Sequence, residues 1–184
     1  IMGGATALHT ACGNGYTKIV DILLKQPSID LNAQNDVGGT PLGCASENGC
    51  VEIIQLLLKE ESLDVNKKNK VGGTALHIAT ERNQVKVIEL LVSHDSTDVN
   101  AKNNALATAL HIAAIHGLPE CANVLLAHPN IEINPLNDIG KTPLYNTRLM
   151  CPPTGLGREG VYGRHERYEW HIALQQVLLQ RGGL

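Results

Sequence analysis

A four-residue pattern returns at a constant step along this chain of 184 residues. Thr-Ala-Leu-His stands at 6–9, 74–77 and 108–111, while 40–43 reads Thr-Pro-Leu-Gly and 142–145 reads Thr-Pro-Leu-Tyr. Successive copies therefore start 34 residues apart. A fixed period of about 20–50 residues is typical of arrays in which each unit packs on its neighbours. The step favours a stack of like units over a single enzyme-like core.

Each copy reads as a helix that starts at its threonine. A threonine hydroxyl can bond the free N–H groups of a first helical turn, and proline or alanine suits the next position. Apolar residues follow at helical spacing, as in 74–80. A break comes next, where Gly15, Gly49, Asn83 and Gly117 stand at the same position of their repeats. Because glycine and asparagine adopt the left-handed conformation most easily, we expect a positive φ there.

A second helix and a loop complete the unit. Segments such as 51–58, Val-Glu-Ile-Ile-Gln-Leu-Leu-Leu, are apolar on more than one side, which indicates burial between neighbouring units. A polar stretch with turn-forming residues follows, and it holds an asparagine in register in every copy. The sequence therefore predicts an all-α chain built of helix, turn, helix and a hairpin-like loop. We expect the loops near 35–39, 69–73, 103–107 and 137–141.

These motifs together resemble the ankyrin repeat: Thr-Ala/Pro-Leu-His, the glycine in mid-repeat, the Leu-Leu-Leu run and Asp-Val-Asn. The resemblance implies an ankyrin-repeat solenoid over 1–148, with four repeats and the first helix of a fifth. We expect an irregular insertion at 149–170 and a C-terminal helix at 171–184 that closes the stack. The step exceeds the family's usual 33 residues, which predicts a slightly longer loop after each second helix. Ile1 falls in mid-repeat, so we expect a fragment of a longer protein.

His9, His77 and His111 are candidates for metal ligands or general bases. Their spacing would place them one repeat apart, roughly 10 Å from helix packing distances, which is too far for a shared metal. The ankyrin resemblance implies instead that each bonds the backbone of a neighbouring loop. Gly43 and Tyr145 replace this histidine, so we expect lost hydrogen bonds and a looser joint near repeat two.

Composition and motifs exclude several other classes. The net charge of −3 argues against a nucleic-acid binder, and no apolar run reaches the length of a membrane span. The chain has an odd number of cysteines and no Cys-x-x-Cys, which indicates thiols in a reducing, intracellular and cytoplasmic setting without metal. These are Cys12, Cys44, Cys50, Cys121 and Cys151. Gly-Leu-Gly-Arg-Glu-Gly at 155–160 lacks the preceding strand of a nucleotide site. We expect neither an enzyme nor a cofactor.

Side chains that vary from copy to copy on a fixed framework are the candidate binding residues. In the ankyrin family they line a concave groove that grips other proteins. At the hairpin tips they are Asp36, Val37, Lys70, Val71, Asn104 and Asp138, and at the ends of the first helices Glu47, Asn48, Glu81, Arg82, Ile115 and His116. We expect a monomer that binds a partner protein or peptide, within a scaffold, adaptor or regulator. Arg82 and Ile115 are the expected anchors.

Some alternatives stay open. The alternative to a scaffold, adaptor or regulator is an ankyrin domain excised from a larger enzyme or channel whose chemistry lies elsewhere. Asn66 and Asn100 resemble ankyrin asparagines that are hydroxylated in some family members. The lysines at 67, 68 and 70 predict a solvated loop or a patch for an acidic partner. The segment 151–170, rich in Gly and Pro and then in Arg, Tyr and Trp, is a flexible insertion, a binding loop or a non-native tail.

Overall fold

The computed structural model describes residues 3–149, and within this range all regular structure is helical. The helices are α1 (Ala7–Gly13), α2 (Thr17–Leu24), α3 (Pro41–Glu47), α4 (Val51–Leu57), α5 (Ala75–Glu81), α6 (Val85–Val92), α7 (Ala109–His116), α8 (Pro119–Ala127) and α9 (Pro143–Leu149). The insertion and the closing helix expected at 149–170 and 171–184 lie outside this range, apart from Leu149.

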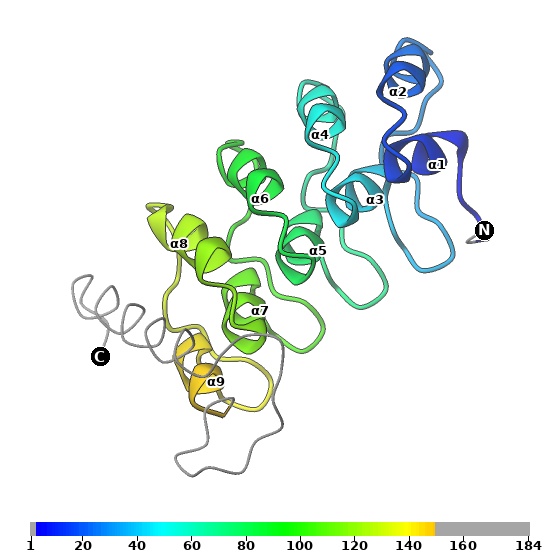
Figure 1. Ribbon diagram of the computed structural model, residues 1–184. Coiled ribbons are helices and arrows are strands. Elements are labelled where there is room, and N and C mark those ends of the chain that lie inside the picture. The colour runs from blue at the N-terminus through cyan, green and yellow to red at the C-terminus, as the bar shows by residue number, and fades with distance from the viewer. Residues whose placement is uncertain (1–2, 150–184) are drawn as a thin grey trace.

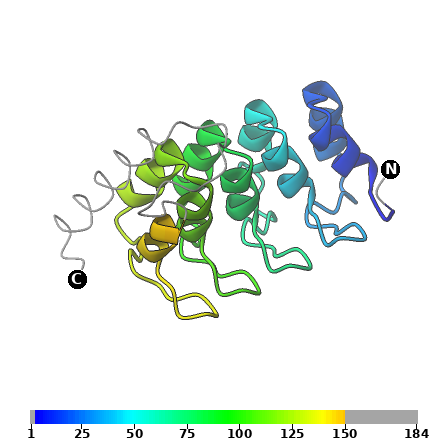
Figure 2. The ribbon, with the colours of Figure 1, turned by 60° about the horizontal axis from the view of Figure 1, so that its bottom comes forward.

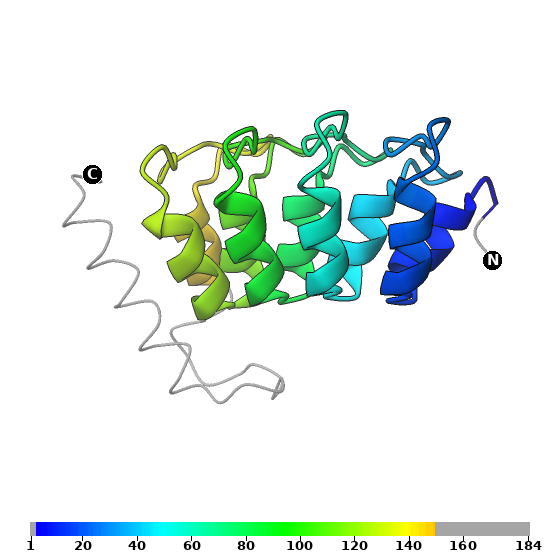
Figure 3. The same cartoon turned by 90° about the horizontal axis from the view of Figure 1, so that it is seen from above.

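The helices form two rows. The inner helices α1, α3, α5, α7 and α9 follow one another in space, and the outer helices α2, α4, α6 and α8 run beside them (Figure 1). Figure 3 shows the outer row side by side. The loops that join one pair to the next all project on the same side, beyond the inner helices (Figure 2). Each pair packs on its sequence neighbours, which is the arrangement of a solenoid.

The inner helices start at the repeated threonines, as the sequence predicts. The Thr40 hydroxyl accepts from the Gly43 N–H at 3.1 Å. In three other repeats the histidine three residues on completes the cap, and in the third repeat the Thr74 N–H donates to His77 Nδ1 at 3.2 Å. The predicted positive φ after these helices is confirmed, including 55° at the non-glycine residue Asn83.

Every loop between repeats is a tight hairpin closed by one asparagine. In the first, the Asn35 N–H donates to the Gly39 carbonyl at 3.0 Å, and Asn35 Oδ1 accepts from the N–H groups of Val37 and Gly39 at 3.1 and 2.9 Å. Asn69, Asn103 and Asn137 repeat this pattern. The predicted loop positions are therefore confirmed, since each closing pair spans the expected five residues.

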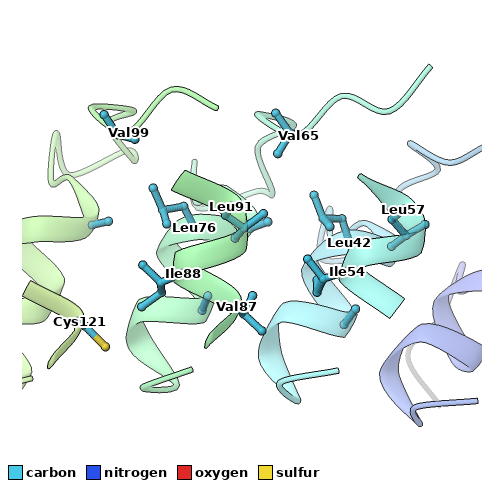
Figure 4. Close-up of a cluster of buried hydrophobic side chains, with 14 of the residues drawn as sticks. Leu42, Ile54, Leu57, Val65, Leu76, Val87, Ile88, Leu91, Val99 and Cys121 are labelled. Carbon is cyan, nitrogen blue, oxygen red and sulfur yellow. The ribbon is translucent and has the colours of Figure 1, made fainter. Parts of the chain in front are cut away.

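The core is a thin aliphatic layer between the two rows of helices. Leu42 from an inner helix and Ile54 and Leu57 from an outer helix are buried together, and Leu76, Ile88 and Leu91 occupy the same places one repeat on (Figure 4). No phenylalanine is needed, because side chains from one helix pair have only to fill the space to the next pair. Stability then comes from contacts between neighbouring repeats.

The first repeat shows what a neighbour contributes. Ile19 on α2 is 47% exposed, whereas Ile53, Val87 and Cys121, at the same position of the next repeats, are at most 1% exposed. The difference arises because an outer helix precedes α4, α6 and α8 in the stack and contacts each of them. No outer helix precedes α2 among residues 3–149.

Ile53→Ala and Ile19→Ala test this contrast with the same chemical change at equivalent positions. Ile53→Ala removes fully buried methyl groups and should cost roughly 2–5 kcal/mol of unfolding free energy. Ile19→Ala should cost less than about 1 kcal/mol, because little apolar area returns to water. Urea denaturation followed by circular dichroism measures both. Equal losses would show that repeat one is packed like the inner repeats.

Candidate functional site

The structure divides the predicted binding residues into two rows. The tip residues Asp36, Val37, Lys70, Val71, Asn104 and Asp138 are all exposed on the hairpins, which precede the inner helices. Glu47, Asn48, Glu81, Arg82, Ile115 and His116 lie at the opposite ends of these helices, and all but the half-buried Glu47 are exposed. The two rows are separated by an inner helix, which in α3 has seven residues and is about 10 Å long. The predicted site is thus a band with two edges.

Arg82 is already paired. Its Nη2 lies 2.5 Å from Oε1 of Glu47, so the ion pair joins the ends of α5 and α3. Both side chains remain partly exposed, and such a pair contributes little to stability because water screens it. The pair does fix the direction of the guanidinium. A partner carboxylate must therefore approach the remaining N–H donors of Arg82 or displace Glu47.

Residues between the two edges were missed by the sequence analysis. Cys44, Ile78 and Ile112 are half-buried, each on an inner helix three and four residues before the helix-end residues. Residues at i, i+3 and i+4 share one helix face, so Ile112 lies on the face of Ile115 and His116. The signal was available, because the spacing alone places these side chains in the same stripe.

Part of the lysine cluster at the second hairpin contacts the loop of the next repeat. Lys68 Nζ donates to the Lys102 carbonyl at 2.8 Å, one repeat away. Lys68 and Lys70 are exposed, and Lys67 is half-buried. The acidic-partner interpretation of this cluster stays a prediction.

The three repeated histidines are structural. Their Nε2 atoms lie 2.8 Å from Gly39 O, 3.1 Å from Ala107 O and 3.0 Å from Lys141 O, each on the hairpin of the following repeat. A carbonyl only accepts, so Nε2 carries the proton and Nδ1 accepts from the threonine N–H. The expected bond to a neighbouring loop is confirmed. Residues 3–149 hold no cluster of three or more candidate metal ligands.

Two repeats lack this histidine. A Cβ on Gly43 would lie 3.2 Å from Cδ1 of Ile78, so the isoleucine of the next repeat takes up the neighbouring space. Glycine has no side chain to bond the following hairpin, so the expected loss of hydrogen bonds is confirmed, whereas the looser joint stays a prediction. At Tyr145, Lys141 Nζ lies 3.8 Å from the ring centroid. This cation–π contact lies within one repeat, whereas the histidine bond joins consecutive repeats.

Asn66 and Asn100 connect consecutive repeats. Asn66 Nδ2 donates to the Ser96 carbonyl at 2.6 Å, and its Oδ1 accepts from the Asp98 N–H at 2.8 Å. Asn100 makes the equivalent pair with Asn130 and Glu132 at 2.7 and 2.8 Å. Both side chains are therefore engaged at both polar atoms. Their hydroxylation stays a prediction.

The cysteines of the described part are unsuited to nucleophilic chemistry. Burial raises the pKa of the Cys12 thiol to about 12 and that of the Cys121 thiol to about 11. Burial also raises the pKa values of Cys44 and Cys50. These four thiols are free, and thiols with raised pKa values carry little thiolate at neutral pH. Cys151 lies outside the described residues.

A family model for ankyrin repeats, in three copies, matches residues 2–69 and 61–137. The chain belongs to the ankyrin-repeat family. Ankyrin repeats are in general protein–protein interaction modules and are typically non-catalytic. No curated protein matches the chain. Among residues 3–149, no helix has the length and apolar character that crossing a membrane requires.

The buried histidines make stability depend on pH. Burial lowers the pKa of His77 and of His111 below the usual 6.5, although the bonds to Ala107 and Lys141 oppose the shift. The unfolded chain therefore takes up protons that the folded ankyrin domain does not, and stability is lost as pH falls below about 6.5. We expect a lower urea midpoint at pH 5.5 than at pH 7.5.

His77→Gln is the matched variant for this measurement. It removes one of the two histidines with a lowered pKa. The fall in the urea midpoint from pH 7.5 to pH 5.5 should therefore be smaller than in the wild type, whatever the midpoint at pH 7.5. A wild-type midpoint that stays level or rises on acidification would contradict the assigned protonation state.

Proposed function

We propose that this ankyrin domain binds a partner protein or peptide across the band between its hairpin tips and its helix ends, mainly on repeats two to four. The observation that carries the proposal is that side chains differ from copy to copy there, on a framework that repeats. Asn48, Arg82 and His116 share one position of three repeats and differ in charge, and the position before it is glutamate in two repeats and Ile115 in the next. One scaffold that presents different side chains is suited to recognition.

The chemistry of the band indicates what a partner must offer. Ile78, Ile112 and Ile115 supply an apolar stripe on α5 and α7, and Ile115 is exposed. Glu81 and the Glu47–Arg82 pair lie beside this stripe on α5 and α3. A partner segment that places an aliphatic side chain on the stripe and charged groups over α3 and α5 would match it. A standard contact of about 800 Å² per partner needs several repeats.

The wider role fits a scaffold, adaptor or regulator. An ankyrin domain of a larger enzyme or channel would use the same band, with the chemistry elsewhere in the polypeptide. We propose in addition that the domain acts as a monomer. We also propose that it works in the cytoplasm, which the free thiols of the described part support.

The test replaces Glu81, Arg82, Ile115 and His116 together by alanine. These side chains are exposed, so the fold should persist, and the affinity for a partner retained by the wild-type protein should fall at least tenfold. The matched control replaces four exposed outer-helix residues of α4 and α6, namely Glu52, Gln55, Lys86 and Glu89. Calorimetry with the purified partner measures all three proteins. Unchanged affinity in a folded helix-end variant would rule out this band.

Glu47→Gln tests the role of Arg82 separately. The substitution weakens the pull on the guanidinium without changing the shape of the side chain, so a partner carboxylate should bind Arg82 more tightly. We expect a severalfold gain in affinity that disappears when Arg82→Ala is added. A gain that survives Arg82→Ala would assign the effect to repulsion by Glu47 rather than to release of Arg82.

A further inference from the structure

We propose that the hairpin tips bind one amphipathic helix of a partner protein, with an apolar residue at every seventh position. The tip row consists of Val37, Val71, Ala105 with Leu106, and Ile139. The inference rests on the proposed function, because it names the partner element that one edge of the band receives.

The row consists of aliphatic side chains that water reaches. Val37, Val71 and Ile139 share one position of three hairpins and are 52%, 66% and 66% exposed. In the third hairpin this position is Ala105, and the neighbouring Leu106 is 47% exposed instead. Single exposed aliphatic residues are common on protein surfaces. Here one recurs on each of four hairpins that stand side by side (Figure 2).

Leu106 is held in an unfavourable backbone conformation. Its φ is 52°, while the equivalent residues Gly38, Gly72 and Gly140 have φ values of 74°, 75° and 68°. A leucine costs free energy in this left-handed region that a glycine does not. Strain of this kind at an exposed site, where three sister hairpins avoid it, indicates that the side chain serves a contact with another molecule.

The backbone N–H groups of the hairpin tips are not free to pair with a β-strand. In the second hairpin, the N–H groups of Asn69, Val71, Gly72 and Gly73 donate within the loop. The remaining N–H, that of Lys70, donates to the Val37 carbonyl at 3.2 Å in the hairpin before it. The other three hairpins repeat all five bonds. Strand addition relies on free main-chain donors, so recognition must use side chains.

The repeat distance selects a helix. Neighbouring repeats lie roughly 10 Å apart, the upper end of helix packing distances. Seven residues of an α-helix advance about 10.5 Å and return close to the same face. Three residues of a strand advance about as far but reverse the side-chain direction. A polyproline II segment also fits the distance, yet such segments dock on aromatic-lined grooves, and the tip row has no aromatic residue.

Charges beside the row set the partner's polar pattern. The residue before each tip position is Asp36, Lys70, Asn104 or Asp138, all exposed. None of them takes part in an ion pair within residues 3–149. A matching helix carries a basic, an acidic, a neutral and a basic residue beside its four successive apolar positions. Such a helix spans about 22 residues.

The experiment uses synthetic peptides of four heptads with leucine at every seventh position. Two peptides carry Lys, Glu, Gln and Lys beside the leucines in forward and in reverse order, so that either helix direction is sampled. The control peptide has the same composition with leucine at every fifth position, which scatters the leucines around the helix. We expect one heptad peptide to bind the full chain at least tenfold more tightly than the control, by fluorescence anisotropy.

Two variants of the protein complete the test. The first variant replaces all four exposed tip residues. It should bind the heptad peptide at least tenfold more weakly, and it carries Val37→Ser, Val71→Ser, Leu106→Gly and Ile139→Ser. The second variant, Leu106→Gly alone, should raise the melting temperature by about 2–4 °C for a chain of this size. It should still lower the affinity for the heptad peptide. Equal binding of the heptad and control peptides, or full binding by the folded four-residue variant, overturns the inference.

The two proposals fail separately. If the helix-end variant keeps its full affinity for a purified partner, the proposed function is wrong, whatever the peptides do. If the tip substitutions leave peptide binding unchanged while the helix-end variant loses its partner, the helical occupant of the tips is wrong and the binding band stands.

Discussion

Burial of aliphatic side chains between consecutive repeats is the contact on which the rest of this structure depends. A single helix pair leaves an apolar face open, as Ile19 does on α2, and the same position is closed when another outer helix precedes it. Polar bonds then follow the same route. Each histidine bonds a carbonyl of the next hairpin, and Asn32, Asn66 and Asn100 each bond the loop one repeat on. Damage at one repeat is therefore expected to reach its neighbours first.

The hairpins are closed by backbone and asparagine hydrogen bonds, so the residues that hold the fold differ from those available to a partner. Because Asn35, Asn69, Asn103 and Asn137 hold their loops from inside, the loops close without the tip side chains. Among the tip residues, Asn104 adds one bond between hairpins, since its Nδ2 donates to the Lys70 carbonyl at 3.0 Å. The other tip side chains can vary without loss of stability, and the tips differ in charge from repeat to repeat. Leu106 is the exception, since it lowers stability at a position where glycine would suit the chain better.

Much of the architecture was predictable from local rules. The constant step gave the stack, the threonines gave the helix starts, and the Gly/Asn alternation at Asn83 gave the positive φ. The histidine bonds followed from the ankyrin resemblance. The site was less predictable. The ion pair of Arg82 with Glu47 and the position of Ile78 beside Gly43 depend on residues about one repeat apart, and no sequence rule sets the rotamers of such pairs.

The sequence by itself determined the repeat, its helices and its loops, because these depend on contacts within a few residues that recur in every copy. The tertiary structure decided which side chains are left for a partner. Val37 and Ile53 are both aliphatic in the sequence, and only the stacking of helix pairs buries one at 0% exposure and leaves the other at 52%. Burial is a property of the neighbouring repeat, so the residue alone does not encode it.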